Sequence, residues 1–108
     1  MLRFDIITIF PEIFDSYFKE SLIKRAVDNR LIKINVHNLR KWAKDKRRTT
    51  DDKPFGGGLG MVMKVEPIYK AIKAIKKGKK AKVILFSPGA KKFNQKMAPK
   101  LSKLDQVV

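Results

Sequence analysis

The sequence predicts an α/β domain with a mostly parallel sheet and flanking helices. A strand pattern, a helix pattern and a second strand pattern follow one another within about 35 residues, the size of a βαβ unit. A further helix and strand are predicted over residues 67–86. The chain has 108 residues, of which 44% are hydrophobic. That length suits one small domain with a modest core, and that composition excludes a wholly disordered polyelectrolyte.

The first half supplies the βαβ unit. Residues 2–9 are rich in β-branched and aromatic side chains, which predicts a strand buried on both faces. Pro11 begins a helix whose apolar residues recur at helical spacing as far as Asn29, the expected C-terminal stop. Residues 31–36 alternate between apolar and polar side chains and predict the second strand.

The second half repeats the alternation of helix and strand. Pro67 begins a helix with isoleucines on its inner face and lysines on its outer face, and Gly78 follows as a left-handed cap. Residues 82–86 predict a short, central, buried strand. Pro99 falls inside the next helix pattern, so that helix either begins late, with Pro99 in its first turn, or is kinked. Val107 and Val108 resemble the start of a further buried strand, cut off before it can pair.

The charge is uneven along the chain. Lys and Arg number 26 against 10 Asp and Glu, a net charge of +16. Residues 1–52 carry 12 basic and 8 acidic side chains, whereas residues 53–108 carry 14 lysines and only Glu66 and Asp105. This surplus predicts a polyanionic partner, most simply nucleic acid, although lysine on solvated helix faces also gives a basic composition.

Several classes of protein and site are excluded by the sequence. No apolar run reaches the length of a membrane span, and Asp5 interrupts the position where a signal peptide would be apolar. We therefore expect a cytoplasmic protein with no membrane partner. The chain has no Cys and a single His, so neither a disulfide framework nor a metal site is predicted. That histidine, His37, is expected to be structural, and Trp42 is expected to anchor the following loop on the core.

A polar loop and a glycine loop are the first candidate site. The glycines at positions 56, 57, 58 and 60 match neither the phosphate-loop pattern nor the dinucleotide fingerprint. They still permit close approach of a ligand or another chain. Asp51 and Asp52 could accept a proton or orient a base, and the alternative is that they balance charge within a turn.

The turn Ser87–Gly89 is a second candidate site, because ligands of open α/β sheets bind beyond the carboxyl ends of strands.

Several motifs together resemble the bacterial tRNA (guanine-N1)-methyltransferases. The similarity begins at Phe4–Glu12 and continues through Asp45–Gly58, Gly60–Lys64 and Glu66–Ile68. It resumes at Val83–Pro88 and at Phe93, Asn94 and Gln95, so it covers nearly the whole chain in the family's order. Two positions depart from the family pattern. Leu59 stands where the family usually has Pro, and Ser87-Pro88-Gly89-Ala90 stands where it usually has Ser-Pro-Gln-Gly.

The resemblance implies a fold, an activity and partners. The fold is a knotted (SPOUT-type) α/β methyltransferase domain that works as a homodimer. The activity is transfer of a methyl group from S-adenosylmethionine to N1 of the guanosine at tRNA position 37, beside the anticodon. No metal is implied.

The resemblance also implies site residues. The family lines its cofactor pocket with the segment matching Leu85, Phe86, Ser87, Pro88 and Gly89. Asp51 matches a loop carboxylate associated with catalysis, and the substrate tRNA is expected at Arg47, Arg48, Asp52, Gly58 and Gly60.

Family members are roughly twice as long as this chain. Residues 1–108 are therefore expected to be the N-terminal portion of the methyltransferase domain, ending before the knot is complete and without the C-terminal tRNA-binding domain. The main general base would lie outside these residues, so the chain alone is expected to be inactive. The alternatives are a small basic RNA-binding protein without catalysis, and a chain that does not fold stably alone, whose exposed sheet edge would then invite oligomers.

Overall fold

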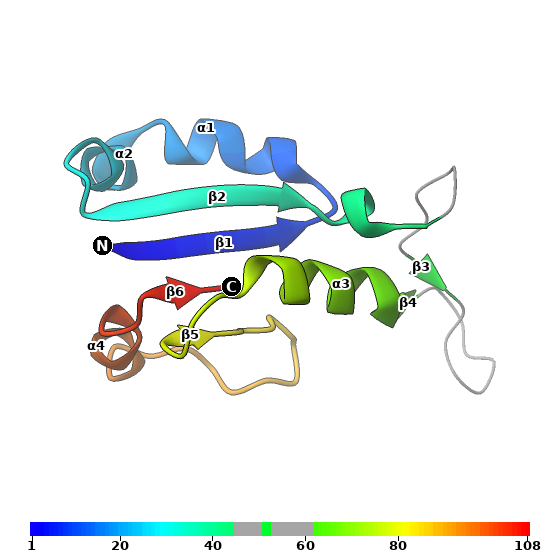
Figure 1. The fold of residues 1–108 in the computed structure, drawn as a ribbon. Coiled ribbons are helices and arrows are strands. Elements are labelled where there is room, and N and C mark those ends of the chain that lie inside the picture. The colour runs from blue at the N-terminus through cyan, green and yellow to red at the C-terminus, as the bar shows by residue number, and fades with distance from the viewer. Residues whose placement is uncertain (45–50, 53–61) are drawn as a thin grey trace.

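A computed structural model describes residues 1–44, 51–52 and 62–108, and the side chains of Ser21, Asp51, Asp52 and Val62 lie outside the description. Four of the described strands form an all-parallel sheet in the order β2-β1-β6-β5, flanked by helices (Figure 1). The strands are β1 Leu2–Thr8, β2 Ile32–Asn38, β5 Ala81–Lys82 and β6 Gln106–Val107. The predicted α/β class with a parallel sheet is confirmed.

The β1–β2 pair is the longest ladder of the sheet. It runs from Leu2 opposite Ile32 to Thr8 opposite Asn38. Both predicted strands are therefore correct in position. Burial differs from the expectation, because only Asp5 of β1 is fully buried and its apolar residues are half-buried.

The helix predicted over residues 11–29 is broken into three pieces. These are the 3-10 helix η1 Pro11–Phe14 and the α-helices α1 Asp15–Phe18 and α2 Ser21–Asp28. Glu20 has an extended backbone, with φ −131° and ψ 162°, which interrupts the helical hydrogen bonds and redirects α2. Pro11 begins η1 and Asn29 ends α2, as predicted.

The core lies between β1 and α3, which spans Val65–Ile75. Leu39, in the 3-10 helix η2 Leu39–Trp42, is buried with Ala71 and Ile75 of α3, and Trp42 packs against this cluster. Trp42 therefore anchors the start of the following segment, as predicted. Gly78 has φ +81°, as expected for a left-handed position. Helix α3, however, ends at Ile75 and is followed by an extended Lys76, so Gly78 serves the turn into β5 rather than the helix cap.

The C-terminal region confirms one expectation and corrects another. Helix α4, Met97–Ser102, begins late and holds Pro99 in its first turn, one of the two predicted alternatives. Val107 does pair, contrary to expectation: β6 lies between β1 and β5 and forms hydrogen bonds with both.

Two short strands, β3 Asp51–Asp52 and β4 Val62–Met63, form a separate antiparallel pair beyond the carboxyl end of β2 (Figure 1).

The predicted buried strand 82–86 is mostly absent. Strand β5 ends at Lys82, and the amide of Ile84 donates a last ladder bond to the carbonyl of Val108 at 2.8 Å. Beyond Ile84 the described chain offers no neighbouring strand, so Leu85 and Phe86 are 82% and 91% exposed. Strand β5 is consequently at the edge of the described sheet rather than at its centre.

Candidate functional site

The segment after β5 forms one wall of a groove of about 440 Å³, and α4 forms the other. Leu85, Phe86 and Ser87, three of the five predicted cofactor-binding residues, line it. Pro88 and Gly89 lie outside the lining, in a turn in which the amide of Ala90 donates to the carbonyl of Ser87 at 3.1 Å. The lining is mostly apolar, with a lysine rim, and consists of Lys82, Val83, Ile84, Leu85, Phe86, Ser87, Ala90, Lys91, Phe93, Met97, Lys100 and Leu101.

The backbone of this wall has amide groups that are free to donate hydrogen bonds. Within the described ranges, the amides of Leu85 and Phe86 have no hydrogen-bond acceptor. Exposed amides beside apolar side chains suit a planar, nitrogen-rich ligand, because the ring packs on the side chains while its edge bonds to the backbone. The groove could therefore hold the nucleoside part of a cofactor.

The predicted substrate loop is described only in part. Asp51 pairs with Met63 and Asp52 with Val62 across the β3–β4 hairpin. Arg47, Arg48, Gly58 and Gly60 lie outside the described residues. The hairpin stands at the end of the molecule away from the start of β5 and α4 (Figure 1).

An ion-pair cluster at the start of α3 was not predicted. Glu66 Oε1 accepts from Lys44 Nζ at 2.7 Å and from Lys70 Nζ at 3.4 Å. The hydrogen bond from Lys44 lowers the pKa of Glu66, and the same bond raises the pKa of Lys44. The cluster therefore ties Lys44, the last described residue before position 45, to the start of α3.

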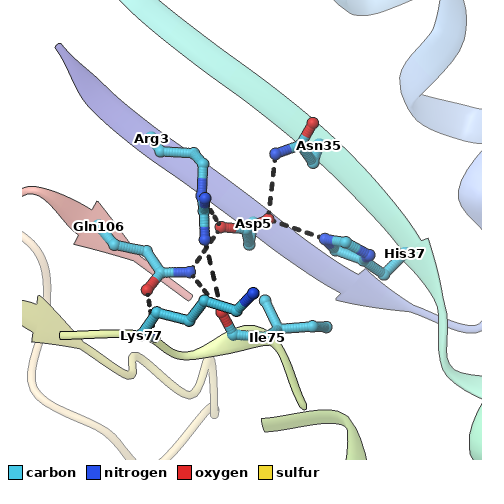
Figure 2. Close-up of polar contacts among 7 residues, drawn as sticks. All are labelled: Arg3, Asp5, Asn35, His37, Ile75, Lys77 and Gln106. Atoms are coloured by element: carbon cyan, nitrogen blue, oxygen red, sulfur yellow. Dashed lines mark hydrogen bonds and ion pairs between the residues drawn. The ribbon is translucent and has the colours of Figure 1, made fainter.

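A second unpredicted cluster surrounds the buried carboxylate of Asp5 (Figure 2). Asp5 Oδ2 accepts from Arg3 Nε at 2.8 Å and from Gln106 Nε2 at 2.7 Å. Its Oδ1 accepts from Asn35 Nδ2 at 3.2 Å and lies 2.8 Å from His37 Nε2. Gln106 Nε2 also donates to the carbonyl of Ile75, at 2.8 Å. One carboxylate therefore joins β1, β2, β6 and the end of α3.

The hydrogen bonds decide the ionisation of Asp5. Burial alone raises the pKa of this carboxyl, but the bonds from His37, Gln106, Arg3 and Asn35 together outweigh burial and hold the pKa below its ordinary value. A buried carboxylate whose two oxygens are both engaged by neighbouring side chains is typical of a structural group. The hollow of about 210 Å³ beside Asp5 is lined by the same partners, Arg3, Asn35 and His37, together with residues at the end of α3. The interpretation of His37 as structural agrees with its place in this cluster.

Other kinds of site are not found in the described part of the chain. No three His, Asp or Glu side chains lie close enough there to hold a metal ion. None of the described helices has the length and apolar character that crossing a bilayer requires.

Comparison with known proteins decides the family. The family profile described as "tRNA (Guanine-1)-methyltransferase TrmD" matches residues 2–108. The chain belongs to this family. A tRNA (guanine-N(1)-)-methyltransferase of Dictyoglomus turgidum is 53% identical over 108 residues, which are 100% of this chain and 44% of that protein. The corresponding protein of Citrifermentans bemidjiense is 51% identical over 99% of this chain and 43% of its own length.

A solved structure of the family has the same fold. The crystal structure of tRNA (m1G37) methyltransferase from Aquifex aeolicus superposes with a TM-score of 0.82 at 34% sequence identity, covering 98% of this chain and 48% of that one. The chain thus spans less than half the length of these relatives and corresponds to their N-terminal part.

Proposed function

We propose that this chain is the N-terminal part of a methyltransferase that acts on N1 of the guanosine at tRNA position 37, with S-adenosylmethionine as methyl donor. The observation that carries the proposal is the family match over residues 2–108. The Aquifex aeolicus relative is a tRNA (m1G37) methyltransferase by name. A cytoplasmic homodimer is part of the same proposal.

The groove after β5 supports the cofactor assignment. S-adenosylmethionine would supply an electrophilic methyl group and present an adenosine moiety for binding. Leu85 and Phe86 offer apolar contact area, and their amides are free to bond to the adenine edge. Ser87, Pro88 and Gly89 would close the end of this wall. Among the described residues, no acidic side chain lines the groove. We therefore propose that carboxylates for the ribose hydroxyls come from the part of the relatives that this chain does not span.

Methyl transfer to N1 of guanine also requires removal of the N1 proton by a base within hydrogen-bond reach. Asp51 is the candidate carboxylate in this chain, beside Asp52 and the tRNA-binding residues Arg47, Arg48, Gly58 and Gly60. We place the main base in the remaining part of the relatives. The 108 residues alone would therefore not turn over tRNA, and a basic RNA-binding module is the rival function.

Titration calorimetry with S-adenosylmethionine tests the cofactor assignment. We expect saturable binding that is weakened at least about tenfold by Leu85→Asp, because a desolvated carboxylate on the groove wall disfavours an apolar contact. Leu85 is largely exposed, so the variant should keep its fold. Leu22→Asp is the matched control on the exposed face of α2, and it should bind like the unmodified chain.

Two outcomes would oppose the assignment. Binding unchanged by Leu85→Asp would place the cofactor elsewhere. Binding of tRNA with no detectable cofactor binding would favour the RNA-binding module.

A further inference from the structure

The amino-terminal end of the sheet gathers lysines from three separate segments. We call this surface the basic edge and define it by five exposed lysines: Lys33, Lys77, Lys79, Lys80 and Lys103. They come from β2, the α3–β5 turn and the end of α4. Figure 1 shows that α4, the N-terminus and the beginning of β2 lie at this same end of the molecule.

Hydrogen bonds and strand register make the edge continuous. Arg3 of β1 pairs with Lys33 on one side and with Gln106 on the other, and Gln106 pairs in turn with Ala81. The amide of Lys77 donates to Gln106 Oε1 at 2.8 Å (Figure 2). The amide of Asp105 donates to the carbonyl of Lys80 at 2.9 Å. The segments that carry the lysines are thus fixed to one another through β6.

The charges of this edge are not neutralised within the described part of the chain. None of the five lysines has an ion-pair partner there. Two acids lie nearby. Asp5 is buried and already accepts from four side chains, and Asp105 is exposed on the edge itself. By contrast, Lys24, Lys44 and Lys70 elsewhere pair with carboxylates.

We propose that the basic edge binds the phosphate backbone of structured RNA. Four strands spaced about 4.8 Å apart give an edge about 14 Å wide, enough to contact several phosphates. Lysine is a point charge suited to phosphate contact, and the five residues include no ring on which a base could stack. The contact is therefore independent of base sequence.

This inference rests on the proposed function for the identity of the RNA. The basic edge lies at the opposite end of the sheet from the β3–β4 hairpin, where the substrate loop begins and ends (Figure 1). A tRNA bound at both places would contact the protein with its modified base at one end and with a more distant stretch of backbone at the other. The edge would add affinity without choosing the methylated base.

Fluorescence anisotropy with labelled tRNA, and with an unrelated RNA hairpin, tests the edge across a salt series. For the triple variant Lys77→Gln, Lys79→Gln, Lys80→Gln we expect binding weakened by about tenfold or more near 0.1 M salt. Its plot of log K against log salt should be shallower by about 2 to 3, since each lost phosphate contact removes about 0.7 to 0.9 from the slope. Both RNAs should be affected alike.

Three controls make the result decisive. Replacing Lys24 and Arg25 of α2, and Lys19 just after α1, by Gln removes the same charge and should leave most of the affinity. The variant Lys77→Arg, Lys79→Arg, Lys80→Arg keeps the charge and should bind like the unmodified chain. Circular dichroism checks that each variant is folded.

Equal losses in the two Gln triple variants would overturn the proposal, since net charge alone would then explain binding. Preferential binding to vesicles with anionic headgroups over RNA would also overturn it. Loss of S-adenosylmethionine binding in the calorimetric experiment, with RNA binding intact, would contradict the proposed function and leave the basic edge standing.

Discussion

Asp5→Ala is expected to lower the free energy of unfolding by about 3–5 kcal/mol, the range seen when one partner of a buried charge pair is removed. Asp5 is 3% exposed. The substitution would leave Arg3, Asn35 and Gln106 with donors facing an empty position, and His37 would lose its carboxylate partner. Urea unfolding followed by circular dichroism measures the loss.

The matched control is Asp28→Ala. Asp28 accepts a hydrogen bond from Lys24 at 2.6 Å on the exposed face of α2, so its removal should cost no more than about 0.5 kcal/mol.

The contribution of Asp5 to stability depends on pH. Because the pKa of Asp5 is held below its unfolded value of about 3.9, the stability that Asp5 contributes is present above that pH and is lost as the pH falls through the folded pKa. The Asp5→Ala variant should therefore lack part of the acid-dependent loss. A destabilisation below about 1 kcal/mol would contradict the structural role.

Leu39→Ala is expected to destabilise the chain by about 2–5 kcal/mol, since it removes buried methyl groups and leaves a cavity. Leu39 is 1% exposed and packs against Ala71 and Ile75. It connects η2 to α3 at the point where the chain enters the segment that carries Arg47 and Arg48. The loss should appear as a lower midpoint in urea with an unchanged slope.

The same substitution on the surface is the control. Leu22 in α2 is 74% exposed, and Leu22→Ala should change the free energy of unfolding by no more than about 0.5 kcal/mol. Similar effects for the two leucines would show that Leu39 is not at the core of the fold.

Local patterns were sufficient for the elements whose partners lie close by. The β-branched run of β1, the alternation of β2 and the isoleucine spacing of α3 each predicted an element that the structure contains. Pro11 and Asn29 marked helix boundaries because their backbone preferences act locally.

Elements that depend on distant partners were predicted less well. The apolar run 82–86 has strand character, but Leu85 and Phe86 have no described strand beside them. The break at Glu20 is not visible in the apolar spacing, which is continuous across it. The Asp5 cluster brings together Asp5 and Gln106, which are 101 positions apart in the sequence. Its only sequence signal was the two polar pairs at alternate positions, Arg3 with Asp5 and Asn35 with His37.

In the candidate site, too, only the part that depends on nearby residues could be predicted and then located in the structure. The strand-end rule and the family resemblance both indicated Ser87, and the structure places Leu85, Phe86 and Ser87 on a groove. Contacts of Pro88 and Gly89 with a cofactor, and of the substrate loop with tRNA, remain predictions, because they depend on partners and on residues outside the described ranges.

The most direct test of the proposed function is a chimera. Residues 1–108 would replace the matching N-terminal part of the Dictyoglomus turgidum relative, of which they cover 44%. Methyl transfer from S-adenosylmethionine to unmodified tRNA would be measured, and the modified nucleoside identified by mass spectrometry. We predict N1-methylguanosine at position 37 with the chimera, and none with the 108 residues alone. A folded chimera that binds tRNA but forms no N1-methylguanosine would contradict the proposed function.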